Sequence, residues 1–177
     1  AMVMNVDASA FADVEAGNMI ITTDGIAVSE IEDTTDPIIT DATIDLNDGT
    51  IVITSSETID NTPSSSKIDL TKAWVCNTGL SSGTCVSMSD ATIVNTDSDG
   101  VTLTLTLTES DRAFAIAHSN TAGGDATDAA FFVYDTAFFT DIAENAVQGE
   151  SAIQFTVETE DTTDPTITDA TIDLNDG

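Results

Sequence analysis

Two groups of acidic residues, each just ahead of a proline, are the residues of this sequence best suited to metal chemistry. The first comprises Glu32, Asp33 and Asp36 before Pro37, and the second comprises Glu160, Asp161 and Asp164 before Pro165. Ca2+ takes six to eight oxygen ligands, which separate chain segments often supply together. We therefore predict a Ca2+ site at each linker, between consecutive domains, completed either by the hairpin-tip acids Asp45 and Asp48 or by a loop acid such as Asp141. The alternative is a solvated acidic linker.

Cys76 and Cys85 are the only cysteines, and a short stretch rich in turn-forming residues separates them. Their even number, their local spacing and the lack of an adjacent histidine favour a disulfide over a metal site. Closing a loop of this length restricts the unfolded chain by about 2.7 kcal/mol in the loop-entropy model. A disulfide also predicts an oxidising compartment, and we expect an extracellular or cell-surface protein.

Three other patterns predict structure rather than catalysis. Residues 79–83 (GLSSG) match a serine-nucleophile motif with Ser81, but that motif needs a strand before it, a helix after it and a partner histidine. His118, the only histidine, falls at the end of a predicted helix, where we expect a packing role. Residues 95–100 copy the first half of a calcium loop without its distal acid, which favours an acidic turn. We expect a protein that is not an enzyme.

The charge of the chain excludes several classes of partner. Asp and Glu number 32 against three Lys and Arg, so the net charge is −29. Nucleic acids and anionic membranes need a basic footprint, and neither is expected to bind. Surface carboxylates repel one another within a Debye length, so the folded chain should favour divalent cations or high salt. The apolar runs are too short to span a bilayer, and an export signal or anchor is expected outside this segment.

A long internal repeat organises the chain. Residues 32–49 and 160–177 are identical at 17 of 18 positions and lie 128 positions apart, and a weaker match extends backwards from both. This period is too long for a solenoid unit and suits a complete domain with its own core. We predict the C-terminal part of a preceding repeat at 1–32, one whole repeat at 33–160 and the first strand of the following repeat at 161–177.

Alternation of apolar and polar residues predicts short strands over most of this repeat. The expected strands lie near residues 39–46, 50–56, 66–75, 89–96, 101–108, 130–135 and 151–158. Asp48-Gly49 predicts a hairpin turn between the first two strands. Thr108, followed by two acids, predicts a capped helix that is apolar on most sides and buried against a sheet. About seven strands predict an all-β, immunoglobulin-like β-sandwich with one short inserted helix.

Several phrases of the sequence resemble a known class of domain. The segments DTTDP (33–37), IDLNDGTIVIT (44–54), SETID (56–60) and DIAEN (141–145) are similar to bacterial-type Ig-like, cadherin-like tandem repeats of large extracellular surface proteins, adhesins and filaments. The likeness covers the whole repeat and both flanking fragments. It implies an end-to-end array of domains outside the cell that serves adhesion, an envelope or a surface filament.

The expected function is therefore structural: a tandem-repeat segment of an extracellular filament or adhesin, stiffened by cations at its linkers, with adjacent copies of the repeat as partners. One alternative is a module that binds carbohydrate or a surface receptor through its loops. A single Trp and a single Tyr are poor material for stacking on sugars. Another alternative is a filament subunit that completes its partial end domains with strands from a neighbouring chain.

Overall fold

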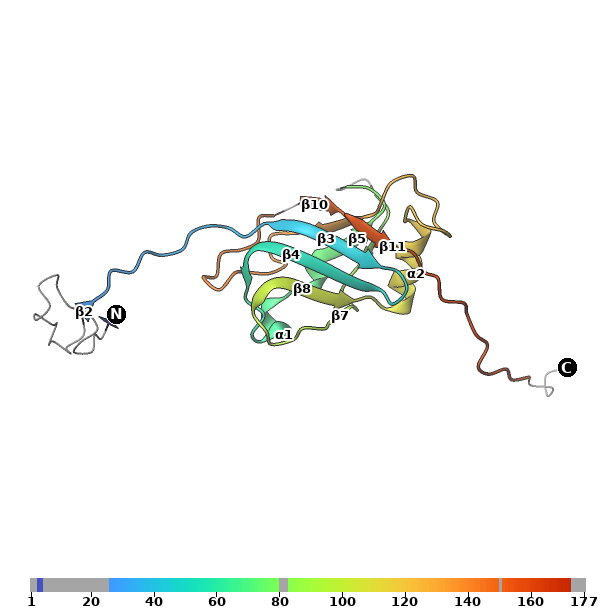
Figure 1. Ribbon diagram of the computed structural model, residues 1–177, viewed down its shortest axis with the longest axis horizontal. Helices are drawn as coiled ribbons and strands as arrows, with labels where there is room; N and C mark the ends of the chain where they lie inside the picture. The colour runs from blue at the N-terminus through green and yellow to red at the C-terminus, as the bar shows by residue number, and fades with distance from the viewer. Residues whose placement is uncertain (1–2, 5–25, 80–82, 150, 173–177) are drawn as a thin grey trace, which may run out of the picture. The chain divides into compact units, whose positions relative to one another are not determined.

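The computed structural model of the protein describes residues 3–4, 26–79, 83–149 and 151–172. The chain divides into two compact units, Ala1–Asp33 and Thr34–Gly177. The described residues of the first unit include two short strands, β1 (Val3–Met4) and β2 (Ile26–Ala27), which pair antiparallel. All other elements belong to the second unit (Figure 1).

The described part of the second unit contains nine strands in two sheets. The first sheet has the order β11-β3-β4-β8-β7, and the second has the order β10-β9-β5-β6. The bounds of the strands are β3 (Ile39–Asp45), β4 (Thr50–Ile59), β5 (Ala73–Cys76), β6 (Cys85–Ser87), β7 (Thr92–Ile93), β8 (Gly100–Thr106), β9 (Phe131–Tyr134), β10 (Ser151–Gln154) and β11 (Val157–Thr159). The helices are α1 (Ser64–Lys67), α2 (Glu109–Ala117) and a turn of 3-10 helix, η1 (Leu70–Lys72).

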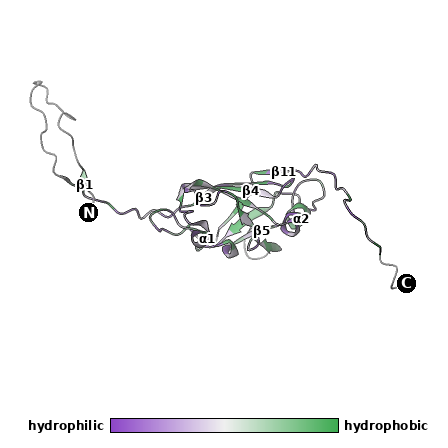
Figure 2. Cartoon of the chain, turned by 90° about the horizontal axis from the view of Figure 1, so that it is seen from below, coloured by the Kyte–Doolittle hydropathy of each residue, from purple (hydrophilic) through white to green (hydrophobic). Residues whose placement is uncertain are grey.

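One hydrophobic core joins the two sheets. Alternate residues of β4 and β8, such as Ile53 and Leu103, are fully buried together with Val75 of β5 and Phe132 of β9. Figure 2 shows β3 and β4 in one layer and β5 in the other. Because strands from both layers bury the same cluster, the unit is a β-sandwich, and the predicted all-β class is confirmed.

Aromatic side chains fill the part of the core around β9. The ring of Phe132 lies 6.0 Å from that of Tyr134 and 5.6 Å from that of Phe138, and Phe138 and Phe139 meet edge to face at 5.4 Å. These separations lie in the range where aromatic pairs attract one another beyond their simple burial. The loop that follows β9 is thereby fixed to the core, although it carries no long strand.

The predicted hairpins and the helix start are present. β3 and β4 pair with Asp45 opposite Thr50, and β7 pairs antiparallel with β8. Thr108 caps α2, because its hydroxyl accepts the Asp111 N–H while donating to the Asp111 carboxylate. The prediction that the helix is buried against a sheet holds only in part: Asp111 and Ala115 of α2 are buried and Ile116 packs against the core, whereas Ala113 and Ala117 are exposed. The two sheets already cover each other, so α2 lies at one end of the sandwich (Figure 1).

The first and last strands of the repeat run parallel and side by side. β11 pairs with β3 from Val157 opposite Thr43 to Thr159 opposite Asp45. Because parallel neighbours point the same way, the chain enters the sandwich at one end and leaves at the other (Figure 1). We call these the leading end, where β3 begins, and the trailing end, where β11 finishes. β4, with ten residues, extends about 30 Å between them.

Truncating the central aromatic side chain tests the shared core. We expect Phe132→Ala to lower the free energy of unfolding by about 3 to 5 kcal/mol, because Phe132 is fully buried. Ile142→Ala is the control, since Ile142 is 54% exposed, and its effect should stay within about 0.5 kcal/mol. Urea denaturation measures the free energy of unfolding of both variants, and the comparison requires that their m-values be equal. Equal effects would contradict a core centred on β9.

Candidate functional site

At the trailing end, the hairpin tip between β3 and β4 holds the chain that leaves β11. The Leu46 N–H donates to the Thr159 carbonyl at 2.9 Å, and the Asn47 Nδ2 donates to the Glu160 carbonyl at 2.9 Å. The Asn47 Oδ1 accepts the Thr162 N–H at 2.9 Å. Residues beyond the predicted boundary at 160 are thus hydrogen-bonded to this sandwich.

Arg112 of α2 adds an ion pair to the same place. Its Nη1 donates to the Asp161 carboxylate and to the Leu46 carbonyl, both at 2.6 Å. Its Nε and Nη2 donate to the two oxygens of Glu109, each at 2.8 Å. The side chains of Arg112 and Asp161 are only 18% and 20% exposed, so the pair is less screened than an ordinary surface pair.

The ionisation of these groups reflects their contacts. The hydrogen bond from Arg112 lowers the pKa of the Asp161 carboxyl, and the Thr163 N–H lowers it further. Arg112 lowers the pKa of Glu109 in the same way, while Glu109 and then Asp161 raise the pKa of the guanidinium. All three groups are therefore charged at neutral pH.

At the leading end, the backbone just after the linker is bonded to two other segments. The Pro37 carbonyl accepts the Gln148 N–H at 2.9 Å. The Ile38 N–H donates to the Ser56 hydroxyl at 3.0 Å, and the Ser56 N–H donates to the Ile38 carbonyl at 2.9 Å. Pro37 is buried, although the preceding linker residues Thr34, Thr35 and Asp36 are exposed. The linker is thus tied to the sandwich at Pro37 and Ile38.

Two carboxylates lie close together at this leading end. Oxygens of Glu57 and Asp141 are within 4.8 Å of each other. Asp141 is 3% exposed, and its two oxygens accept hydrogen bonds from the backbone and the side chain of Asn145 at 2.8 and 2.9 Å. Oxygen donors of this kind suit a hard cation such as Ca2+. Glu57 was not among the predicted ligands, because the alternation of β4 marks it only as a strand residue.

The predicted Ca2+ ligands fall in different places. Glu32 and Asp33 belong to the first unit. Asp141 lies at the leading end, where it bridges to Ile59, whereas Glu160 and Asp161 lie at the trailing end, about 30 Å away. Asp36 and Asp164 are exposed. Within one repeat the structure therefore does not bring Asp141 together with the second acidic group, and Asp161 is paired with Arg112.

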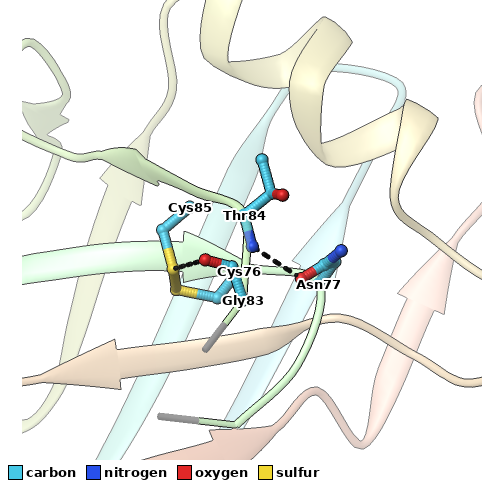
Figure 3. Close-up of a disulfide and its surroundings, with 5 residues drawn as sticks. All are labelled: Cys76, Asn77, Gly83, Thr84 and Cys85. Atoms are coloured by element: carbon cyan, nitrogen blue, oxygen red, sulfur yellow. Dashed lines mark hydrogen bonds between the residues drawn. A yellow bond between two sulfur atoms is a disulfide. The ribbon is translucent and has the colours of Figure 1, made fainter. Parts of the chain in front are cut away.

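The predicted disulfide between Cys76 and Cys85 is present and crosses from β5 to β6 (Figure 3). Beside it, the Asn77 side chain accepts the Thr84 N–H at 2.9 Å, which closes the loop at its base. Ser81, the serine of the GLSSG pattern, lies outside the described residues. The covalent link indicates an oxidising environment.

The remaining sequence patterns have structural partners. His118 follows α2 and meets Phe114 edge to face, with ring centroids 4.3 Å apart. In the acidic turn, the Asp99 carboxylate accepts the Asn61 N–H at 2.8 Å, and the Asp97 carboxylate accepts the Ser64 N–H at 3.1 Å. These carboxylates brace the turn between β4 and α1.

One polar cleft opens beside α1. Its lining comprises Ser66, Lys67, Asp69, Thr136, Ala137, Phe139, Thr140, Glu144 and Ala146. Lys67 is held by Asp60 at 2.6 Å, and that contact lowers the pKa of Asp60 and raises the pKa of Lys67. Phe139, the one aromatic residue of the lining, is only 1% exposed. The cleft therefore offers hydrogen bonds but no flat apolar platform.

With this geometry in view, comparison with known proteins gives no relative: no protein-family model, no curated protein and no solved structure matches the chain. The similarity to Ig-like repeats remains a prediction from the sequence. Within the described residues, neither helix has the length and apolar composition needed to cross a bilayer.

Removing the disulfide tests its contribution to stability. We expect Cys76→Ala with Cys85→Ala to lower the free energy of unfolding by about 2 to 3 kcal/mol, because the unfolded chain regains the entropy of the closed loop. Dithiothreitol should destabilise the native chain by a similar amount and leave the double variant unchanged. If dithiothreitol left the free energy of unfolding of the native chain unchanged, the disulfide would not stabilise the fold.

Proposed function

We propose that the chain is part of an extracellular array of β-sandwich repeats, which acts as a load-bearing spacer or filament rather than as an enzyme. The parallel pairing of β3 and β11 carries this proposal. A repeat whose chain enters and leaves at opposite ends is suited to serial connection. The near-identical sequences 128 positions apart supply the units to be connected.

The same pairing suits the sandwich to bear tension. A pull on the two linkers would slide β3 and β11 past each other, so that their hydrogen bonds carry the load together. Besides the strand ladder, Thr156 donates from its backbone to the Ala42 carbonyl at 2.9 Å and from its hydroxyl to the Asp41 carboxylate at 2.7 Å. The trailing strand is therefore tied to the leading strand by side-chain as well as backbone bonds.

The segments that flank the sandwich fit neighbouring copies. Val3 and Ile26, in β1 and β2, lie 128 positions before Phe131 and Gln154, in β9 and β10. Both pairs of strands are antiparallel, and their pairing registers differ by one residue. On the other side, residues 161–172 form no strand here. In this segment Ile167 and Ile172 are 92% and 81% exposed, whereas their counterparts Ile39 and Ile44 in β3 are 7% and 2% exposed. A following sandwich would bury them.

An extracellular setting supports the same function. The disulfide favours an oxidising compartment, and a net charge of −29 keeps a long array soluble without attracting nucleic acid. We place Ca2+ at the leading end, where Glu57 and Asp141 offer carboxylate oxygens beside the acidic linker. Because Ca2+ takes six to eight oxygens, these two would be part of a set to which linker acids such as Asp36 contribute.

The polar cleft beside α1 favours one second candidate, a module that binds carbohydrate hydroxyls by donating from Lys67 and accepting at Asp69 and Glu144. A glycan array probed with the chain separates the two functions. Specific binding that is lost in Glu144→Ala would favour the carbohydrate module. No binding, together with the mechanical behaviour described next, would favour the spacer.

Pulling the sandwich in two directions tests the load-bearing function. With attachment points at residues 36 and 163, the force loads β3 against β11 in shear, and we expect a high unfolding force. With attachment points at residues 36 and 142, both at the leading end, the strands separate one bond at a time, and we expect a clearly lower force. Single-molecule force spectroscopy measures both, and equal forces would remove the mechanical argument.

Calcium titration tests the cation. After treatment with a chelator, added Ca2+ should raise the melting temperature of the chain, because a ligand that binds only the folded state stabilises it. The rise should be lost in Asp141→Asn and kept in Asp128→Asn, whose side chain is exposed elsewhere. The readout is the difference between the melting temperatures of one variant with and without Ca2+. A general destabilisation by Asp141→Asn therefore does not obscure it. An unchanged melting temperature in the native chain would contradict the site.

A further inference from the structure

We propose that the hydrogen bonds of Asn47 and Arg112 form a clasp, which fastens the linker to the preceding sandwich and forces consecutive repeats into direct end-to-end contact. The clasp comprises Leu46, Asn47, Glu109 and Arg112 on the sandwich and residues 159–162 on the linker. The partner is the next copy of the repeat. The inference rests on the proposed array, and it adds how the copies are joined.

Asn47 is suited to this task because a carboxamide donates and accepts at once. Asp45 fixes Asn47 by accepting its N–H at 2.9 Å and one Nδ2 hydrogen at 3.0 Å. The second Nδ2 hydrogen is then directed at the Glu160 carbonyl, and the Oδ1 is directed at the Thr162 N–H. The side chain thereby takes the place of a strand partner for the departing linker.

Arg112 lies over the same hairpin tip because Gly49 leaves room for it. A Cβ at Gly49 would stand 3.3 Å from the Leu107 Cβ and 3.4 Å from the Arg112 Cδ, and the φ of Gly49 is +76°. This left-handed backbone conformation also favours glycine. Of only three basic residues in the chain, one is thus devoted to holding the linker through Asp161.

The repeat shows how little chain is left for the joint. Pro165 and Thr166 correspond to Pro37 and Ile38, whose backbone groups are tied to the leading end. The one mismatch between the two copies, Ile38 against Thr166, leaves these bonds possible because Ile38 uses only its backbone and its side chain is 41% exposed. The next sandwich should therefore hold residues 165 and 166 of its linker.

Only two residues, Thr163 and Asp164, lie between Thr162, which one sandwich holds, and Pro165, whose counterpart Pro37 is held by its own sandwich. Three steps of an extended chain reach at most about 11 Å. Two sandwich ends that are fastened at both sides of so short a segment must touch. Since both ends carry exposed acids, such as Asp48 and Glu144, a loose linker would let them swing apart, and the clasp prevents this.

The clasp is tested on the 177-residue chain by 15N relaxation of its backbone amides. We expect order parameters near about 0.85 up to Thr162 and below about 0.6 after Pro165. In Arg112→Gln and in Asp161→Asn the fall should begin at Glu160 or Asp161. Asp161→Asn lies beyond β11, so it tests the clasp even if Arg112→Gln disturbs the fold. Lys72→Gln removes a different ion pair, with Asp135, and should leave the profile unchanged.

The joint is tested on a chain in which residues 33–160 occur twice in succession before the tail. Residual dipolar couplings should fit one common alignment tensor for both sandwiches in the native sequence. Two independent tensors are expected once the aspartate that directly follows the first copy, in the place that Asp161 holds after a single copy, is changed to asparagine. Two tensors in the native sequence, or a native profile that falls directly after Thr159, would overturn the inference. If either result were found while the unfolding force still depended on the pulling direction, the proposed array would be supported and only the clasp would be rejected.

Discussion

The parallel contact between β3 and β11 is the constraint on which the rest of the architecture depends. It places the first and last strands of the repeat next to each other at one side of the five-stranded sheet, and it separates the two linkers by the length of the sandwich. An antiparallel arrangement of the same two strands would return the chain to its starting end. The acidic linkers would then lie together instead of alternating with folded domains.

Electrostatic repulsion acts against this arrangement at every point of the surface. All three basic side chains of the chain form ion pairs: Lys67 with Asp60, Lys72 with Asp135, and Arg112 with Glu109 and Asp161. The Lys67–Asp60 and Arg112–Asp161 pairs join segments that the strand ladders do not connect, whereas the Lys72–Asp135 pair flanks the β5–β9 ladder. The pairing of Arg112 lies where the chain leaves the sandwich, which is where repulsion between successive domains would be greatest.

Local patterns predicted much of the fold, but the strand expected at residues 66–75 begins only at Ala73, because α1 and η1 precede it. Long-range contacts account for most of the rest. The turn at Asp48-Gly49, the cap at Thr108 and the cysteine pair each involve residues close in sequence, and each was predicted. The pairing of β11 with β3 and the contact of Arg112 with Asp161 join residues far apart in the chain, so no periodicity marks them. The apolar composition of α2 suggested burial, but the burial of a helix depends on where the sheets leave space.

The near-identity of residues 161–177 to residues 33–49, which contain β3, has a consequence for folding. The tail carries nearly the same sequence as the segment that pairs with β4. During synthesis or refolding it could therefore pair with β4 in place of β3. Fastened at the trailing end, the tail would have to travel back about 30 Å before it could run alongside β4 in the direction of β3. Four residues, 163–166, span only about half of that distance. Once the sandwich has folded, strand exchange within one copy is therefore blocked by geometry, although the sequences themselves do not distinguish the right strand from the wrong one.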